Sequence, residues 1–278
     1  MQKTSTVTAP HLTIALYQAD GIRGDIAANL DCMARAVRQA AGLGCGLIIF
    51  PEMFLTGYNI GAALPQLAQP AGGPAGREAA RMAREHHIAI LYGYPEAAGS
   101  RIFNAALYVG PDGKVSANYR KTHLFGSYEK TYFQPGDALV MTELEGLNIG
   151  ILICYDVEFP EAVRALTYAG ADLIAVPTAL MKDYCRVAEH VVPTRAYESE
   201  IYVAYVNRCG CEGDLTYCGR ACLVGPDGRD ILRAGVSEEL LIAAIDKHAI
   251  AAERETNPVL KDLRPNLYNA PVKTVGGN

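Results

Sequence analysis

The chain has 278 residues, half of them hydrophobic, and a formal net charge of −5. This size and composition favour a globular protein with a large core, and no basic tract indicates a nucleic-acid partner. The longest apolar runs, such as Leu47–Phe50, are too short to cross a bilayer, so no membrane segment is expected.

The first half of the chain alternates short apolar runs with segments of helical periodicity. Leu12–Gln18 and Leu47–Phe50 are typical of strands, and the second is apolar throughout, as in a strand buried on both faces. The spacing of apolar residues predicts helices over Ile26–Leu43 and Gly76–Glu85. Two further strands are expected at Ile88–Tyr94 and Asn104–Val109.

The second half continues the same alternation. Strands are predicted at Asn148–Ile153, Asp172–Val176, Ile201–Val206, Gly219–Val224 and Leu240–Ile245. Helices are predicted from Phe159 to Gly170 and over Val187–Ser199, the first opened by a proline in its first turn. From about Ile250 the chain is a largely polar tail with little periodicity. Interleaved strands and helices predict an α/β fold in a single domain, residues 1–278, and leave open whether it has one sheet or two.

Targeting and cysteine usage suggest a compartment. Met1 to Pro10 is polar, without the apolar segment of a secretory signal, so we expect a cytoplasmic protein. The chain has eight cysteines, and without a signal most should be reduced thiols rather than a disulfide framework. A buried structural role is the usual one for such a cysteine.

One glutamate stands where chemistry could occur. Glu52 comes two residues after the apolar run Leu47–Phe50 and is surrounded by apolar residues. Burial would raise its proton affinity, as suits a general base or acid, although a loop-capping role is the alternative.

A lysine and a cysteine complete the set. Lys121, among aromatic and apolar neighbours, could direct an ammonium at a developing oxyanion, although a lone lysine is more often a surface residue. Cys154 lies between a predicted strand and the start of a helix, where a helix N-terminus lowers a thiol's pKa and backbone N–H groups can receive an oxyanion. Glu52, Lys121 and Cys154, each near a strand end, could meet at one edge of a sheet.

The sequences around these residues resemble the three signature segments of the nitrilase superfamily. They are Pro-Glu-x-x-x-x-Gly-Tyr at Glu52, Tyr-Arg-Lys-x-His-Leu at Lys121 and Cys-Tyr-Asp-x-x-Phe-Pro-Glu at Cys154, in the family's order. The resemblance extends from about Leu12 to about Ile245. It implies a four-layer α-β-β-α sandwich that pairs into homodimers through its outer helices, with no metal and no organic cofactor.

The same resemblance implies a mechanism. Glu52 would take the proton of the Cys154 thiol as it attacks an amide carbonyl, and Lys121 with the Tyr155 backbone N–H would stabilise the oxyanion. Ammonia would leave, and water would hydrolyse the thioester. Glu129, which matches a second family glutamate, would position Lys121.

The substrate implied is a small aliphatic amide. Leu55–Gly61, Tyr92–Glu96 and Tyr119–Gly126 most resemble 5-aminopentanamidases, which hydrolyse 5-aminopentanamide to 5-aminopentanoate and ammonia, and stereoselective aliphatic amidases are a neighbouring branch. A terminal ammonium would need acidic or aromatic partners. Candidates by position in loops are Tyr58, Asp183, Tyr184, Glu212 and Asp214.

Other interpretations remain at this point. Cys154 could work with His123 as a cysteine–histidine hydrolase. A metal could be held by Cys209, Cys211, Cys218 and Cys222, although their spacing is not that of a zinc ribbon. The fold could also serve a non-catalytic binding protein. A nitrilase or an N-carbamoyl amino acid hydrolase would share the triad.

Overall fold

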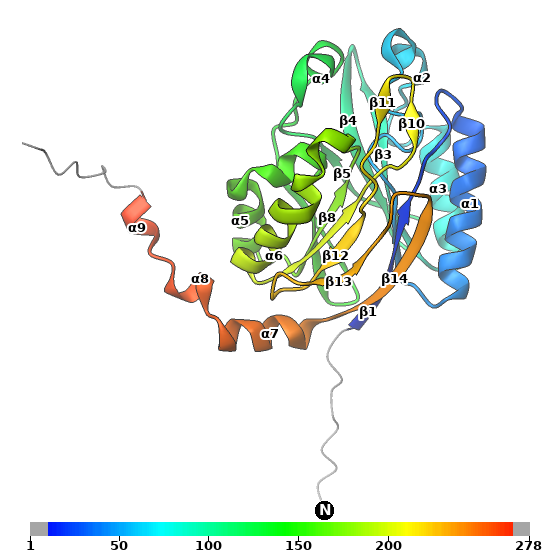
Figure 1. Ribbon diagram of the computed structural model, residues 1–278. Helices are drawn as coiled ribbons and strands as arrows, with labels where there is room; N and C mark the ends of the chain where they lie inside the picture. The colour runs from blue at the N-terminus through cyan, green and yellow to red at the C-terminus, as the bar shows by residue number, and fades with distance from the viewer. Residues whose placement is uncertain (1–10, 269–278) are drawn as a thin grey trace, which may run out of the picture.

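The computed structural model describes residues 11–268, which form two six-stranded sheets packed face to face. Helices cover the outer face of each sheet, so the layers follow the order α-β-β-α (Figure 1). The predicted α/β sandwich is therefore confirmed, and the question of one sheet or two is settled as two. The segment on which the absence of a secretory signal was predicted, residues 1–10, lies outside the described residues.

The first sheet combines a parallel centre with an antiparallel meander. β1, β2 and β3 are parallel, β14 pairs antiparallel with β1, and β3, β4 and β5 follow one another antiparallel. In spatial order the strands are β14 (Glu239–Asp246), β1 (His11–Gln18), β2 (Leu47–Ile49), β3 (Ala89–Ala98), β4 (Arg101–Val109) and β5 (Val115–Arg120).

The second sheet has the same plan. β7, β8 and β9 are parallel, and β6, β12 and β13 extend them antiparallel. In spatial order the strands are β13 (Asp230–Arg233), β12 (Cys222–Val224), β9 (Tyr202–Val206), β8 (Leu173–Pro177), β7 (Leu147–Ile151) and β6 (Val140–Leu144). A separate hairpin joins β10 (Cys211–Glu212) to β11 (Leu215–Thr216).

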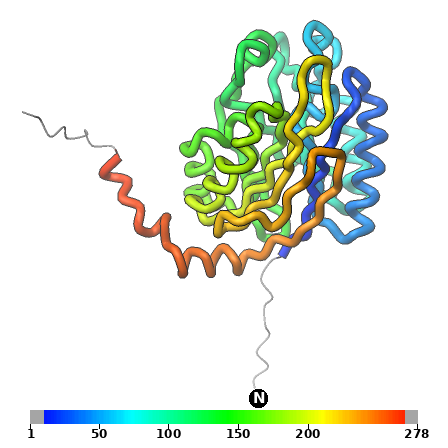
Figure 2. The backbone as a smooth tube through the Cα atoms, viewed as in Figure 1, coloured from blue at the N-terminus to red at the C-terminus, as the bar shows by residue number. Residues whose placement is uncertain are grey.

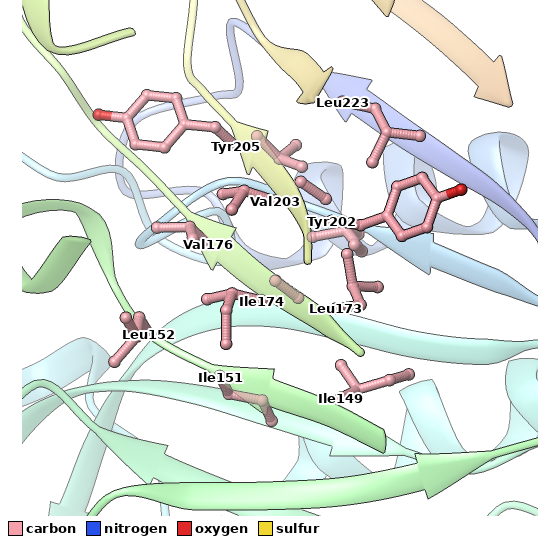
Figure 3. Close-up of a cluster of buried hydrophobic side chains, with 14 of the residues drawn as sticks. Ile149, Ile151, Leu152, Leu173, Ile174, Val176, Tyr202, Val203, Tyr205 and Leu223 are labelled. Atoms are coloured by element: carbon pink, nitrogen blue, oxygen red, sulfur yellow. The ribbon is translucent and has the colours of Figure 1, made fainter. Parts of the chain in front are cut away.

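Burial on two faces explains the continuous apolar runs. In β2, Leu47 and Ile49 join the core between the sheets, while Ile48 between them joins the core under the outer helices. Successive side chains of a strand point to opposite faces, so a central strand of this sandwich must be apolar at every position. Figure 3 shows the same filling around β7, β8 and β9, where Ile151 and Ile174 lie among other buried side chains.

Four helices form the outer layers. α1 (Ile26–Gly42) and α3 (Pro74–His86) cover the first sheet, and α5 (Pro160–Tyr168) and α6 (Val192–Ser199) cover the second (Figure 1). Asp25 caps α1 by accepting a hydrogen bond from the Ala28 backbone N–H, and Pro160 opens α5. The helix predicted over Val187–Ser199 begins with a π-helical turn, Val187–Val191, before α6.

Several elements were not predicted. β5, β6 and β13 are edge strands whose residues are largely exposed or half-buried, so they lack a continuous apolar run. The tail predicted to be irregular contains three helices, which lead away from the body of the molecule (Figure 2). The first of them is tied back to α6 by an ion pair between Arg254 and Glu200. These helices are α7 (Lys247–Thr256), α8 (Val259–Asp262) and α9 (Pro265–Tyr268).

Shorter helical segments lie in the loops. They are η1 (Gly61–Ala63), α2 (Leu64–Leu67), α4 (Gly126–Tyr132), η2 (Cys154–Glu158) and η3 (Lys182–Tyr184). Within residues 11–268, no helix is long and apolar enough to span a membrane. The cytoplasmic location stays a prediction.

Candidate active site

The three residues singled out in the sequence follow three strands that end on the same side of the sandwich. Glu52 follows β2, Lys121 follows β5 and Cys154 follows β7. β2 and β5 run in the same direction within the first sheet. The two sheets are joined at this end, where the Glu52 backbone N–H donates to the Thr178 carbonyl just after β8. The predicted convergence at a sheet edge is therefore present, but it spans two sheets.

Lys121 is held between two carboxylates. Its Nζ lies 2.7 Å from Glu52 Oε1 and 2.6 Å from Glu129 Oε1, and all three side chains are fully buried. Asn104 Nδ2 donates to Glu52 Oε1 at 2.6 Å, and the Tyr58 hydroxyl donates to Glu129 Oε1 at 2.8 Å. The network thus keeps the lysine charged and immobile.

One carboxylate oxygen is left over. Glu52 Oε2 is buried and accepts no hydrogen bond from any residue that the structure describes. Both oxygens of Glu129, by contrast, are occupied, since Oε2 accepts from the Phe125 backbone N–H at 2.7 Å. Glu52 is therefore the carboxylate with a free acceptor oxygen.

Burial governs the protonation of Glu52 and Cys154. It raises the pKa of the Glu52 carboxyl, and the Lys121 ammonium opposes the rise without cancelling it. Burial and the Glu52 carboxylate also raise the pKa of the Cys154 thiol well above its ordinary value. The expected lowering of this pKa by a helix N-terminus is not found, because η2 is only five residues long and burial of the thiol has the larger effect. A thiol of this kind needs a base.

Lys121 behaves differently. Burial alone would lower the pKa of its ammonium, but the Glu52 and Glu129 carboxylates outweigh burial and raise it well above the ordinary value. The lysine is therefore a permanent cation rather than a proton carrier. A fixed positive charge in a buried site can stabilise an oxyanion.

The nucleophile candidate occupies a strained turn. Cys154 has φ +46°, in the left-handed region that non-glycine residues seldom adopt. The turn is secured by the buried carboxylate of Asp156, which accepts from the Ile153 backbone N–H at 3.1 Å and from the Tyr119 hydroxyl at 2.9 Å. Because Tyr119 belongs to β5, Asp156 ties the Cys154 turn to the strand that carries Lys121.

A glycine beneath Glu52 permits its placement. A Cβ atom at Gly93, in β3, would lie 2.4 Å from the Met53 backbone nitrogen and 2.6 Å from Glu52 Cα. No side chain fits at that separation, so only glycine lets β3 pass directly under the Glu52 turn.

A narrow cavity leads to the thiol. Glu129 and Cys154 lie in its wall together with Tyr58 and Tyr155, both predicted from the sequence as substrate-binding residues. The other lining residues are Phe125, Glu158, Ala179, Leu180, Met181 and Tyr184. The Tyr155 backbone N–H belongs to the first turn of η2, where backbone donors have no helical acceptor.

The loop residues proposed for a substrate ammonium are dispersed. Tyr184 lines the cavity, but Asp183 and Asp214 line a neighbouring outer hollow instead. Glu212 is wrong as a candidate, because it is buried in a structural network. Its carboxylate accepts from Arg208 Nη2 at 2.6 Å and from the Tyr58 backbone N–H at 2.9 Å.

Two alternative sites are not assembled. His123 hydrogen-bonds Asp156, stacks on Phe159 and lines a separate, wider groove that does not contain Cys154. Cys218 is disulfide-bonded to Cys185, so it is not free to join the other cysteines around a metal. Among the described residues, His, Cys, Asp and Glu side chains form no cluster that could hold one. The expectation that most of the eight cysteines are reduced thiols is borne out, since six are free and only Cys185 and Cys218 are bonded to each other.

Several residues of the site were missed in the sequence. Asn104 lies within a predicted strand, and Asp156 and Glu158 stand two and four residues after Cys154. Their closeness to the cysteine was a usable signal for the two acids. Nothing local distinguished Asn104, whose contact with Glu52 depends on the pairing of β3 with β4.

Comparison with known proteins agrees with this geometry. The family model described as carbon-nitrogen hydrolase matches residues 13–255. A hydrolase from the pqqF 5′ region of Pseudomonas protegens is 42% identical over 93% of this chain and 91% of its own length. An (R)-stereoselective amidase from a Pseudomonas species is 35% identical, covering 91% of this chain and 92% of its own.

Solved structures of an amidase from Nesterenkonia sp. AN1 have the same fold. One, with butyramide bound, superposes with a TM-score of 0.84 at 33% identity, covering 94% of this chain and 97% of that one. Another, of a Glu→Gln variant, carries the acetamide moiety of fluoroacetamide covalently at the active-site cysteine, with a TM-score of 0.84, 33% identity and coverage of 94% and 96%. With a family match over most of its length and relatives at this identity, the chain belongs to the carbon–nitrogen hydrolase family, in the nitrilase superfamily, and is a hydrolase that acts on amides.

Proposed function

We propose that this protein hydrolyses a small aliphatic amide that ends in an ammonium, with 5-aminopentanamide as the preferred substrate, through a thioester on Cys154. The observation that carries the proposal is the position of Lys121 between Glu52 and Glu129 beside the thiol. The relative solved with butyramide supports a small aliphatic amide. The resemblance of three segments to 5-aminopentanamidases supports the ammonium.

Acylation begins at the free oxygen of Glu52. Glu52 Oε2 takes the proton of the Cys154 thiol while the sulfur attacks the amide carbon, and the carbonyl electrons move onto oxygen. Lys121 Nζ and the Tyr155 backbone N–H stabilise this oxyanion. The intermediate collapses as the C–N bond breaks, and the leaving nitrogen takes the proton from Glu52 and departs as ammonia.

Deacylation reverses the roles of acid and base. Glu52, again ionised, removes a proton from water, whose oxygen attacks the thioester carbon. The C–S bond breaks, the carboxylic acid is released and the proton returns to sulfur. Glu129 accepts from Lys121 and Tyr58 throughout, so its contribution is to hold the lysine in place.

The test is ammonia release from 5-aminopentanamide, neutral aliphatic amides, a nitrile and an N-carbamoyl amino acid. We expect a preference for 5-aminopentanamide that disappears in Cys154→Ala, while Cys211→Ala, which removes an exposed free cysteine, keeps activity. Loss of the oxyanion lysine in Lys121→Met should cost about 10²–10³-fold. A preference for the nitrile or the carbamoyl compound would replace the amidase proposal, and no turnover at all would favour a binding protein.

We also infer that the chain forms a homodimer through its outer helices α5 and α6. Each of them exposes a large aromatic side chain, Tyr168 at 58% and Tyr197 at 45%. Aromatic residues are enriched in protein interfaces, so their exposure on the outer helices favours a partner surface there. Light scattering should give twice the chain mass for wild type and a shift to monomer for the double variant Tyr168→Lys/Tyr197→Lys; a monomeric wild type would contradict the dimer.

A further inference from the structure

Glu158 is an acidic residue of the cavity wall that the mechanism does not use. It stands at the end of η2, four residues after Cys154, and lines the same cavity as the thiol. Its main chain is fixed, because Arg195 Nη2 donates to the Glu158 carbonyl at 2.7 Å and Arg195 Nε donates to the Val157 carbonyl at 2.9 Å. The side chain therefore projects from a rigid position.

The carboxylate of Glu158 is uncommitted. The nearby guanidinium of Arg195 is already occupied by the two carbonyls and by Glu198 Oε1 at 3.0 Å. Arg186 lies over the Tyr184 ring and donates to the Asp183 carbonyl, and it is not part of the cavity wall. Within residues 11–268, no ion pair or hydrogen bond joins the Glu158 carboxylate to another side chain.

Partial burial leaves this carboxylate poorly solvated. It raises the pKa of Glu158, and the Arg186 and Arg195 guanidiniums only partly oppose the rise. A cation that binds next to such a carboxylate stabilises its ionised form. The other acid in the wall, Glu129, cannot offer the same, because its oxygens already accept from Lys121, Tyr58 and the Phe125 backbone.

The rest of the wall suits a methylene chain. Phe125 lies edge-on to Tyr155 at 5.2 Å and to Tyr184 at 5.5 Å between ring centroids. With Leu180 and Met181, these rings line the same cavity as the Cys154 thiol. These features suit a molecule with three parts: an amide for the Cys154 thiol, a short aliphatic chain for the apolar wall and a cation for the Glu158 carboxylate.

We propose that Glu158 is the residue that selects ω-amino amides, by accepting a hydrogen bond from the substrate's terminal ammonium while Cys154 attacks the amide. This inference rests on the proposed function and adds the residue that carries its specificity. Glu158 takes the place of Asp183 and Asp214 as the candidate partner of the ammonium, because those two residues line the outer hollow and not the cavity that contains the thiol.

A matched pair of substrates tests the assignment. Hexanamide has the same chain as 5-aminopentanamide with a methyl group in place of the ammonium. We expect Glu158→Gln to lower the ratio of kcat/KM for 5-aminopentanamide over hexanamide by about 10–100-fold, the range for a charge-assisted hydrogen bond. The change should lie mainly in KM, since the ammonium contact is equal in the ground and transition states.

Two control variants separate contact from general electrostatics. Glu161→Gln removes the charge of an exposed glutamate three residues after Glu158, which lines a different groove. Asp183→Asn removes the charge of an alternative acidic candidate, which lines the outer hollow. Both should leave the ratio within about twofold of wild type. A drop in Asp183→Asn without one in Glu158→Gln would overturn the assignment, as would equal drops in Glu158→Gln and Glu161→Gln.

The outcome also distinguishes this inference from the function on which it rests. A wild-type ratio near one would remove the ammonium-bearing substrate and the role of Glu158 together. A high wild-type ratio that Glu158→Gln does not change would leave the substrate proposal standing and overturn only the assignment of Glu158.

Discussion

At the scale of single residues, the chemistry depends on which groups burial leaves charged. Glu52 and Cys154 both have raised pKa values, whereas Lys121 is kept cationic by two carboxylates. The site therefore rests as a thiol next to a base and a fixed cation, and not as a preformed thiolate–cation pair. This distinction leads to two predictions.

Glu52→Gln should separate hydrolysis from alkylation. Amide hydrolysis needs Glu52 to take a proton and return it to ammonia, so we expect it to fall by at least about 10²-fold, within the range that general acid–base groups contribute. Iodoacetamide needs only a thiolate, and removing the Glu52 charge lowers the pKa of Cys154. We therefore expect iodoacetamide to label Cys154 in Glu52→Gln at the wild-type rate or faster, as measured by mass spectrometry. The exposed thiol of Cys211 is the internal control. Parallel loss of both reactions would contradict the assigned role.

The pH profile should report the raised pKa of Glu52. A base must be ionised, so kcat/KM will fall as the pH drops through that pKa, at a pH above the ordinary glutamate value of about 4.3. Lys121 will not limit activity on the alkaline side near neutrality, because its pKa is raised well above the ordinary value. Circular dichroism over the same range controls for unfolding. An acid limb at or below the ordinary value would show that Glu52 is not the base.

At the scale of elements, the site depends on how strand ends are tied across the two sheets. Asp156, in η2 just after β7 of the second sheet, accepts hydrogen bonds from Tyr119 of β5 and from the Thr122 hydroxyl and His123 backbone that follow β5. These contacts set the Cys154 turn against the Lys121 segment. The carboxylate therefore works as a clamp between two elements that are distant in sequence.

Asp156→Asn should loosen that clamp. An amide has one oxygen to accept hydrogen bonds, so at least one buried donor loses its partner, at a cost of about 1–3 kcal/mol in the free energy of unfolding. A shift of the Cys154 turn by about 1 Å would lower kcat by about 10²-fold. Urea unfolding and steady-state kinetics measure the two effects, and Glu161→Gln, exposed at the start of α5, is the matched control. Unchanged kcat in a destabilised variant would limit Asp156 to a structural role.

At the scale of the whole molecule, the core between the sheets and the disulfide join distant parts of the chain. Apolar residues of both sheets share one continuous core, so we predict that residues 1–278 form one domain and unfold in a single transition. Cys185 and Cys218, 33 residues apart, link the segment after β8 to the loop before β12. Cys185 adjoins Tyr184 of the cavity wall, so this link also borders the site.

Removing the disulfide should destabilise the protein. For a loop of this length, the gain in conformational entropy of the unfolded chain corresponds to about 3–4 kcal/mol. We expect Cys185→Ala/Cys218→Ala, or wild type in dithiothreitol, to lose this much in urea unfolding, while Cys211→Ser loses nothing comparable because its thiol is free and exposed. Equal stability with and without reductant would mean that the two cysteines are not bonded in solution.

The sequence by itself determined the elements with strong local patterns and the residues that end them. Fully buried strands such as β2 and β8 must be apolar throughout, and a charged or thiol side chain directly after such a run is conspicuous. For this reason Glu52 and Cys154 could be identified from one chain. Lys121 was singled out more weakly, by its aromatic and apolar neighbours, and the family resemblance added Glu129. Edge strands such as β5 were not predicted, because their partly exposed residues do not form a continuous apolar run.

Only the tertiary structure decided which strand ends meet and which side chains remain free. Glu212 and Glu158 are both acidic residues of the loops, but their surroundings differ. The Glu212 carboxylate pairs with Arg208, whereas Glu158 lines the cavity. The bond between Cys185 and Cys218 likewise depends on two loops meeting in space. Such contacts arise from long-range packing of two sheets, whose geometry no local sequence pattern encodes, and they decide which carboxylates of the site are buried, paired or free.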